Sequence, residues 1–252
     1  MRSIACLACG VVLAGVSAVQ AQHVVAHRGH WDTDGSAQNS VRSLVKADSI
    51  GCHASEFDVW ITADGVPVVH HDAVAAGMVI ETAQAAEICG VTLANGEHIP
   101  TLAALLDTAA ALSVRLVCEI KPHTDKAREA EAVRRSVAMI GERGLDRRTD
   151  YITFSREALA LLIDIVPQWC GVYYLGGDMS PDELQAVGAA GPDYSMRAYE
   201  AHPGWMERAR ELGMKVNVWT VNTDEDFRRY IDAGADFITT NRPERLQQLI
   251  AR

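Results

Sequence analysis

The chain lacks the features that divide a protein into separate parts. Its 252 residues contain no linker, no low-complexity tract and no run of like charges. A chain of this length can bury one sizeable core. The sequence therefore predicts a single domain over residues 22–252, preceded by a short N-terminal segment.

Positive charge is also scarce. Lys and Arg number 23 against 33 Asp and Glu, and the formal net charge is −10. An acidic protein repels nucleic acid and anionic lipid surfaces at long range, so we expect no nucleic-acid partner. If the substrate is a small anion, cationic groups near the site must offset this field.

The six cysteines show none of the spacings of a zinc finger, and two of them lie in the N-terminal segment. Cys118 and Cys170 fall in or beside strand-like runs, which is typical of buried free thiols. An exported protein can form disulfides, and Cys52 with Cys89 is then the most plausible pair.

Long apolar runs are missing except at the N-terminus. Residues 4–19 are almost all apolar or small, Arg2 precedes them, and Val19-Gln20-Ala21 is typical of a signal-peptidase site. A membrane anchor is the alternative, but the run is shorter than the roughly 20 residues of a spanning helix and no basic stop follows. We expect residues 1–21 to be a signal peptide and the mature protein to be periplasmic or secreted, without stable membrane insertion.

Eight short apolar runs alternate with longer amphipathic ones. Strands are expected at 23–27, 54–61, 114–121, 151–154, 171–175, 193–196, 215–221 and 236–240. Helices are expected at 39–50, 101–112, 125–143, 156–166, 181–187, 204–212, 224–233 and 243–250. These βα units predict an α/β fold, a closed (β/α)8 or TIM barrel, with a doubly wound open sheet as the alternative.

The second unit departs from this alternation. Asp64-Gly65 makes a tight turn into a further apolar segment at 66–71, which predicts a hairpin. A less regular stretch then runs from Asp72 to Pro100 before the next helix. We therefore expect a small hairpin insertion after the second strand.

Acidic side chains gather in the second and third expected strands. Glu56 and Asp58 are two residues apart and Glu119 lies in the next strand, so all three should face the barrel mouth. Three buried carboxylates repel one another and need a cation, and all-oxygen ligands suit Mg²⁺ or Ca²⁺. We predict one divalent cation on these residues. The alternative is a structural salt bridge between Glu119 and Lys121.

Two histidines flank this cluster. His27 ends the first strand and His71 ends the hairpin, and because imidazole titrates near neutral pH, the pair is predicted to transfer protons. His70 competes with His71, since neighbouring side chains in a strand point to opposite faces. Arg28 and Lys121 can both reach a phosphate. The whole set is typical of metal-assisted phosphodiester cleavage.

Two further residues border the predicted site. Gly29 lets the backbone approach a ligand closely or turn with a positive φ. Trp219, near the end of the seventh strand, fits either the wall of a substrate cleft or a plug in the barrel.

The chain resembles the glycerophosphodiester phosphodiesterases from Val24 to Pro243, nearly all of the predicted domain. The matching segments are Ala26-His27-Arg28-Gly29, Asn39, Glu56-Phe57-Asp58-Val59, Thr62 to Asp72, Ile99-Pro100-Thr101-Leu102, Glu119-Ile120-Lys121, Trp219-Thr220-Val221-Asn222 and Thr240-Asn241-Arg242-Pro243. Their order and spacing are together highly specific.

Membership of that family implies a (β/α)8 barrel with the hairpin as a small insertion. It implies a divalent metal on the three carboxylates, His27 and His71 as the acid–base pair, and Arg28 and Lys121 near the phosphate. It also implies that a small-molecule glycerophosphodiester is hydrolysed to glycerol 3-phosphate and an alcohol.

Three departures from the family pattern bear on specificity. Gln38 stands where a glutamate is usual, Asn241 stands where an aspartate is usual, and the arginine and threonine that often follow the His-Asp step are missing after Asp72. The metal and histidine positions are unchanged, so hydrolysis is still implied. The departures concern which alcohol or polyol the pocket accepts.

Two other functions are compatible with the same residues. A phospholipase-D-like lyase acting on lipid phosphodiesters shares this barrel and exposes apolar residues around the mouth, a role open to residues 73–80. A non-catalytic exported barrel that binds a phosphate or polyol is favoured by Gln38, where a charged group is lost. His27 and His71 argue against it.

Overall fold

The structure, a computed structural model, describes residues 22–251. Within that range a ring of parallel strands closes on itself in the order β1, β2, β6, β7, β8, β9, β10, β11. They are β1 (His23–Ala26), β2 (Ala54–Ile61), β6 (Arg115–Ile120), β7 (Thr149–Thr153), β8 (Val172–Tyr174), β9 (Gly191–Ser195), β10 (Asn217–Trp219) and β11 (Phe237–Thr240). Because β1 pairs with both β2 and β11, the predicted (β/α)8 barrel is confirmed and the open-sheet alternative is wrong.

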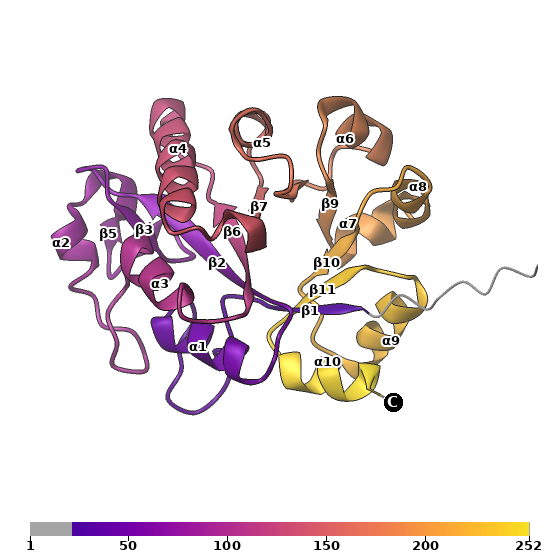
Figure 1. The fold of residues 1–252 in the computed structure, drawn as a ribbon, viewed down its shortest axis with the longest axis horizontal. Helices are drawn as coiled ribbons and strands as arrows, with labels where there is room; N and C mark the ends of the chain where they lie inside the picture. Colours follow the sequence, from indigo (N-terminus) through magenta and orange to yellow (C-terminus); the bar gives the residue numbers. More distant parts are fainter. Residues whose placement is uncertain (1–21, 252) are drawn as a thin grey trace, which may run out of the picture.

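Helices follow the strands and cover the outside of the barrel (Figure 1). They are α1 (Val41–Ser49), α3 (Leu102–Ala109), α4 (Lys126–Glu142), α5 (Arg156–Ile165), α6 (Pro181–Val187), α8 (Trp205–Glu211), α9 (Asp224–Asp232) and α10 (Pro243–Ile250). Several begin at a hydroxyl residue, as where Ser155 accepts from Ala158 N–H and Thr223 from Asp226 N–H. Such caps satisfy backbone donors that have no partner within the helix.

The expected hairpin is present, and a small layer of structure continues from it. β3 (Pro67–Val69) pairs antiparallel with β2, and then come β4 (Val74–Ala75), β5 (Met78–Val79), a 3₁₀ turn at Ile80–Thr82 and α2 (Ala85–Ile88). Figure 1 shows α2, β3 and β5 together at one side of the barrel. This insertion has its own buried cluster, formed by Trp60, Val68, Ala75, Ile80, Ile88 and Ile99.

One expected boundary is wrong. The sequence places Met196 in a strand, but β9 ends at Ser195 and α7 (Met196–Ala201) begins at the next residue. The Ser195 hydroxyl accepts from Ala198 N–H at 3.2 Å, so Ser195 is the N-cap of this short helix. The chain therefore leaves the barrel strand at Ser195, one residue earlier than the apolar pattern indicates.

The apolar core has two layers around the barrel strands. The larger layer lies between the strands and the helices and includes Leu44, Phe57 and Tyr151. A smaller layer fills the barrel interior, and its members are Val25, Ala54, Val117, Ile152, Tyr173 and Leu175. The interior is therefore apolar at mid-height, and polar side chains are grouped at its two ends.

The four cysteines of the described residues are all free. Cys118 and Cys170 are buried, as predicted. The expected Cys52–Cys89 pair is wrong, because Cys52 packs in the core between barrel and helices while Cys89 packs against the cluster of the insertion. Two separate cores hold these thiols apart.

The predicted signal peptide, residues 1–21, lies outside the described residues. Between residues 22 and 251, none of the helices combines the length and the apolar composition that a bilayer-spanning helix requires.

Candidate active site

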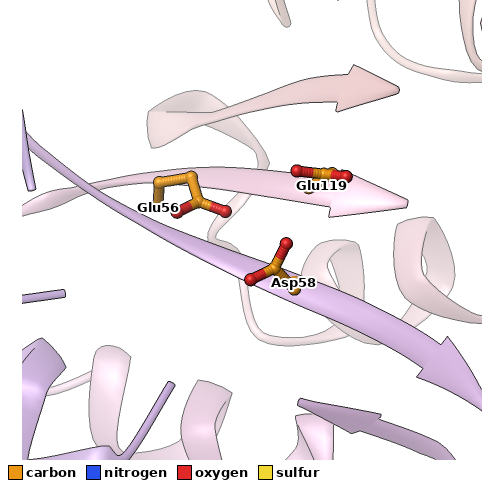
Figure 2. A group of neighbouring side chains, drawn as sticks. All are labelled: Glu56, Asp58 and Glu119. Atoms are coloured by element: carbon orange, nitrogen blue, oxygen red, sulfur yellow. The ribbon is translucent and has the colours of Figure 1, made fainter. Parts of the chain in front are cut away.

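Three carboxylates meet at the carboxyl ends of β2 and β6. Asp58 and Glu119 are register partners on these neighbouring strands, and Glu56 lies two residues before Asp58. One oxygen from each carboxylate lies within 4.8 Å of the others, and all three side chains are buried. Figure 2 shows the groups turned toward one another from the two strands. The predicted cluster is therefore assembled in the structure.

Burial and mutual repulsion dominate the protonation of this cluster. Burial, with Asp58 and Glu119 nearby, raises the pKa of Glu56 well above its usual value. Burial and Asp58 likewise raise the pKa of Glu119 to about 8. Burial also acts on Asp58, but Lys121 and other nearby donors outweigh it and lower the pKa of Asp58. Three ionised acids at this spacing require additional positive charge.

The donor set fits a hard divalent cation. Glu56 Oε1 is buried without a hydrogen-bond partner among residues 22–251. Glu119 Oε1 is buried too, and it lies 2.7 Å from Lys121 Nζ without the geometry of a hydrogen bond. Carboxylate oxygens are the ligands that Mg²⁺ and Ca²⁺ prefer. The three residues are thus suited to hold such an ion.

Lys121 is part of the same cluster. Its ammonium lies 3.1 Å from Asp58 Oδ1 as well as 2.7 Å from Glu119 Oε1. The salt bridge that the sequence offered as an alternative to a metal site therefore exists, but within a three-acid cluster that one lysine does not neutralise. The buried ammonium also lines the adjacent pocket, where it can face a phosphate.

Arg28 joins the loop after β1 to the acids. Its backbone N–H donates to Glu56 Oε2 at 2.6 Å, and its Nη1 donates to Gln38 Oε1 at 2.6 Å. Its Nε lies 3.8 Å from Asp58 Oδ2. The following Gly29 has φ +77° and a Cβ there would overlap Ser43, so the expected need for glycine is confirmed.

His27 directly follows β1, the neighbour of β2, and is held by a residue that follows β11. Its Nδ1 lies 2.8 Å from Asn241 Oδ1. An amide oxygen only accepts, so Nδ1 carries the proton and Nε2 is left unprotonated. Burial and the nearby Arg28 lower the pKa of His27 to about 4. The ring is therefore neutral at physiological pH.

His71 reaches the same pocket from the segment after β3. Its Nδ1 lies 2.7 Å from Asp72 Oδ1, and its backbone carbonyl accepts from Trp60 Nε1 at 3.2 Å. The His71 ring lines the pocket that contains His27, whereas His70 lines a neighbouring cleft that His71 also borders. The structure thus gives His71, rather than its neighbour, access to the predicted site.

The pocket at this end of the barrel has a volume of about 100 Å³. Its apolar wall includes Trp219, whose indole N–H donates to the Asp193 carbonyl at 2.9 Å. The Trp219 ring meets Phe154 edge-on with centroids 5.7 Å apart. Trp219 thus borders the pocket and also packs against the apolar cluster inside the barrel. The remaining lining residues are His27, Arg28, Glu56, His71, Glu119, Lys121, Ile152, Leu175, Asp193, Thr220 and Thr239.

Sequence reasoning assigned no role to two residues that support the site. Asn39 donates from Nδ2 to Asp58 Oδ2 at 2.8 Å and accepts from Asp58 N–H at 3.1 Å. His123 bridges Ile61 N–H and the Lys121 carbonyl, at 3.1 and 2.7 Å. Asn39 belongs to a matched motif, so a signal existed. For His123, the sequence shows only a lone histidine two residues after Lys121.

Comparisons with known proteins agree with this geometry. Residues 27–245 match the sequence model of the glycerophosphoryl diester phosphodiesterase family. A glycerophosphodiester phosphodiesterase of Caldanaerobacter subterraneus subsp. tengcongensis is 28% identical over 250 residues, covering 91% of this chain and 98% of that protein.

Solved structures extend the likeness to the fold. A crystal structure of a glycerophosphodiester phosphodiesterase from Parabacteroides distasonis is 43% identical with a TM-score of 0.90, over 92% of this chain and 98% of that one. An Oleispira antarctica phosphodiesterase, solved with the product sn-glycerol-3-phosphate, shares the fold at 22% identity and a TM-score of 0.78, over 91% and 97%. The predicted family and enzyme class are confirmed: the chain belongs to the glycerophosphoryl diester phosphodiesterase family.

Proposed function

We propose that this protein hydrolyses glycerophosphodiesters to glycerol 3-phosphate and an alcohol. The observation that carries the proposal is one pocket that combines clustered carboxylates with two histidines, an arginine and a lysine. Each group lies at the end of the barrel where (β/α)8 enzymes hold their active sites. Family membership and the names of the relatives agree with this reaction.

In this proposal Glu56, Asp58 and Glu119 hold one divalent cation, Mg²⁺ or Ca²⁺. When bound, the ion supplies Lewis-acid charge that polarises the phosphodiester. Arg28 and Lys121 face the same pocket and bind the non-bridging phosphate oxygens, because both are cationic and neither can accept a hydrogen bond. Phosphoryl transfer depends mainly on such positioning and charge stabilisation.

The two histidines move protons on opposite sides of the reacting phosphorus. His27 Nε2 takes a proton from the nucleophile, which is water or a neighbouring hydroxyl of glycerol, because Asn241 holds the ring as the Nδ1–H tautomer. His71 gives a proton to the departing alkoxide and is oriented by Asp72. Acid–base catalysis of this kind contributes about 10²–10⁴-fold per well-placed group.

A panel of glycerophosphodiesters tests the proposal. The purified protein should release the alcohol from at least one of glycerophosphocholine, glycerophosphoethanolamine and glycerophosphoglycerol, and produce glycerol 3-phosphate in equal amount. A chelator should abolish the release, and restoration by Mg²⁺ or Ca²⁺ identifies the ion. Binding of these diesters without turnover in either metal would instead favour a non-catalytic binding barrel.

A lyase acting on lipid phosphodiesters is the second candidate, and one observation favours it. Val74 and Val79, on the β4–β5 hairpin that follows Asp72, are 46% and 44% exposed. Apolar side chains exposed near a site can contact lipid tails. Product analysis separates the two reactions, because a cyclic phosphate that accumulates indicates the lyase whereas glycerol 3-phosphate indicates the hydrolase.

We also propose that residues 1–21 direct export to the periplasm or beyond, on the strength of their sequence alone. N-terminal sequencing of the protein from its native cells should begin at Gln22. An intact N-terminus in the soluble cell fraction would contradict this.

A further inference from the structure

One buried acid in the pocket has no part in the chemistry described so far. Asp193 lies on β9, opposite Asn217 on β10, and is 2% exposed. Its Oδ1 is buried without a hydrogen-bond partner among residues 22–251. A buried carboxyl oxygen left in this state destabilises the fold, because it has lost water and gained no partner, and a purely structural residue has no reason to retain it.

Asp193 lies at the boundary between two spaces in the barrel. The residue lines the active-site pocket and also a small, mostly apolar cavity of about 20 Å³ inside the barrel, so it lies where the two meet. Val117 and Tyr173 border the inner cavity but not the active-site pocket. Asp193 therefore forms the inner limit of the pocket.

The surrounding polar groups are already engaged with one another. Asn217 Nδ2 donates to Thr239 Oγ1 at 2.8 Å, and the Asn217 side chain also hydrogen-bonds the Asp193 carboxyl, which leaves Oδ1 as the unpartnered atom. Burial raises the pKa of Asp193 to about 7, and only an Asn217 hydrogen bond opposes it. No lysine or arginine of the described residues contributes to that shift. The carboxyl is thus not half of a structural ion pair.

We infer that Asp193 binds a hydroxyl group of the polyol part of the substrate and thereby selects glycerol-containing phosphodiesters. This inference rests on the proposed function, which places the phosphate at Arg28 and Lys121. The pocket wall formed by Trp219 and Leu175 suits the carbon atoms of a polyol, and the Asp193 carboxyl then takes the hydroxyl that reaches deepest.

A neutral hydroxyl fits this position better than a cationic head group. A hydroxyl can donate to an ionised carboxylate or accept from a protonated carboxyl, so it pairs with Asp193 in either state. An ammonium needs the ionised form, which burial disfavours. A substrate that lacks the hydroxyl would leave Asp193 Oδ1 without a partner, and sites of this kind discriminate strongly against such analogues.

Product binding tests the inference without depending on turnover. Isothermal titration calorimetry of the metal-loaded protein compares glycerol 3-phosphate with n-propyl phosphate, which has the same phosphate and carbon chain but no hydroxyls. Wild type should bind glycerol 3-phosphate about 10- to 100-fold more tightly. In Asp193→Ala the ratio of the two dissociation constants should fall to about twofold or less. Asp193→Asn should retain part of the preference, because the amide still forms hydrogen bonds.

The Asp193 substitutions leave the rest of the wall in place. Trp219 is held by the backbone carbonyl of Asp193, which both variants keep. Tyr173→Phe is the matched control, because Tyr173 lines the inner cavity but not the pocket, and its ligand ratio should equal that of wild type.

Three results would overturn the inference. The first is a wild type that binds the two ligands equally well. The second is an Asp193→Ala variant that keeps the wild-type ratio of the two dissociation constants. The third, with phosphocholine titrated as a further ligand, is an Asp193 variant whose affinity falls more for phosphocholine than for glycerol 3-phosphate. Failure of the proposed function would look different, because wild type would then turn over no glycerophosphodiester while the ligand ratio could still respond to Asp193.

Discussion

The two ends of the barrel contain the same kinds of residue in opposite states. At the amino ends of the strands, Asp150 pairs with Arg115 at 3.2 Å and accepts from Gly171 N–H at 2.8 Å. Lys215 pairs with Asp236 at 2.6 Å. At the carboxyl ends, three acids crowd together, and carboxylate oxygens of two of them lack hydrogen-bond partners among residues 22–251.

The histidines at the two ends of the barrel also differ in whether their rings are packed or open to a ligand. His23 and His53 stack on each other at the amino end, with ring centroids 3.9 Å apart, and burial lowers the pKa of His53 to about 4. His27 and His71 instead face an open pocket, each with Nδ1 held by a neighbour. Paired charges and stacked rings stabilise one end, whereas unsatisfied groups at the other are available to a ligand.

Exchanging one acid at each end gives the largest expected contrast. Glu119→Gln should reduce kcat/KM by at least about 10³-fold, because it removes a charge from the proposed cation site. The melting temperature of the metal-free protein should hold or rise, since the raised pKa of Glu119 means that its ionisation opposes folding above pH 4.5. Asp150→Asn should do the reverse, with activity within about twofold and a stability loss of about 1–2 kcal/mol. Matching losses of activity in both variants would remove the distinction between the ends.

Histidine substitutions sharpen the same comparison. His27→Ala and His71→Ala should each lower kcat by about 10²–10³-fold while the circular dichroism spectrum stays that of wild type. His53→Ala, at the amino end, should retain activity within about twofold, and His70→Ala controls for the neighbour of His71. Near-normal turnover in both folded catalytic variants would refute the acid–base assignment.

Asn241 should set the acidic limit of activity. His27 accepts a proton only when neutral, so its pKa of about 4 keeps it competent well below neutral pH. Asn241→Asp places a carboxylate beside Nδ1, raises the pKa of His27 and should move the acidic limb of the kcat/KM profile up by about one pH unit or more. A variant with an unmoved limb would show that another group controls it.

Asp193→Asn should change the stability of the protein in a way that depends on pH. Because the pKa of Asp193 is raised to about 7, its ionisation costs stability as the pH rises from about 4 to 7. The free energy of unfolding of the variant should therefore rise relative to that of wild type across that range, by at most about 4 kcal/mol. Below pH 4 the two proteins should differ little in stability. Urea denaturation at pH 4, 5.5 and 7.5 measures the difference, and a gain that does not vary with pH would exclude ionisation as its source.

Much of this arrangement could be predicted from the sequence because barrel strands alternate strictly. Glu56 and Asp58 had to share a face, and parallel pairing brought Glu119 beside them. The strand of residues 54–61 was predicted at its exact bounds, since both flanks carry turn residues. Patterning of this kind acts locally, so the sequence displays it directly.

The remaining features depend on contacts that no local pattern records. Met196 was assigned to the wrong element, because its apolar side chain continues a strand while the Ser195 hydroxyl caps a helix. The Cys52–Cys89 pair was wrong because the insertion builds a second core. Asp193 gave no signal, since the burial of an oxygen without a partner depends on how neighbouring strands pack and not on any local pattern.

The most direct test of the central claim is a metal titration of chelator-treated protein followed by both calorimetry and turnover of a glycerophosphodiester. We expect one equivalent of Mg²⁺ or Ca²⁺ to bind per chain, with turnover rising in proportion to occupancy, and neither binding nor turnover in Glu119→Gln. Full turnover by protein that holds no divalent ion, or unchanged binding in that variant, would contradict it.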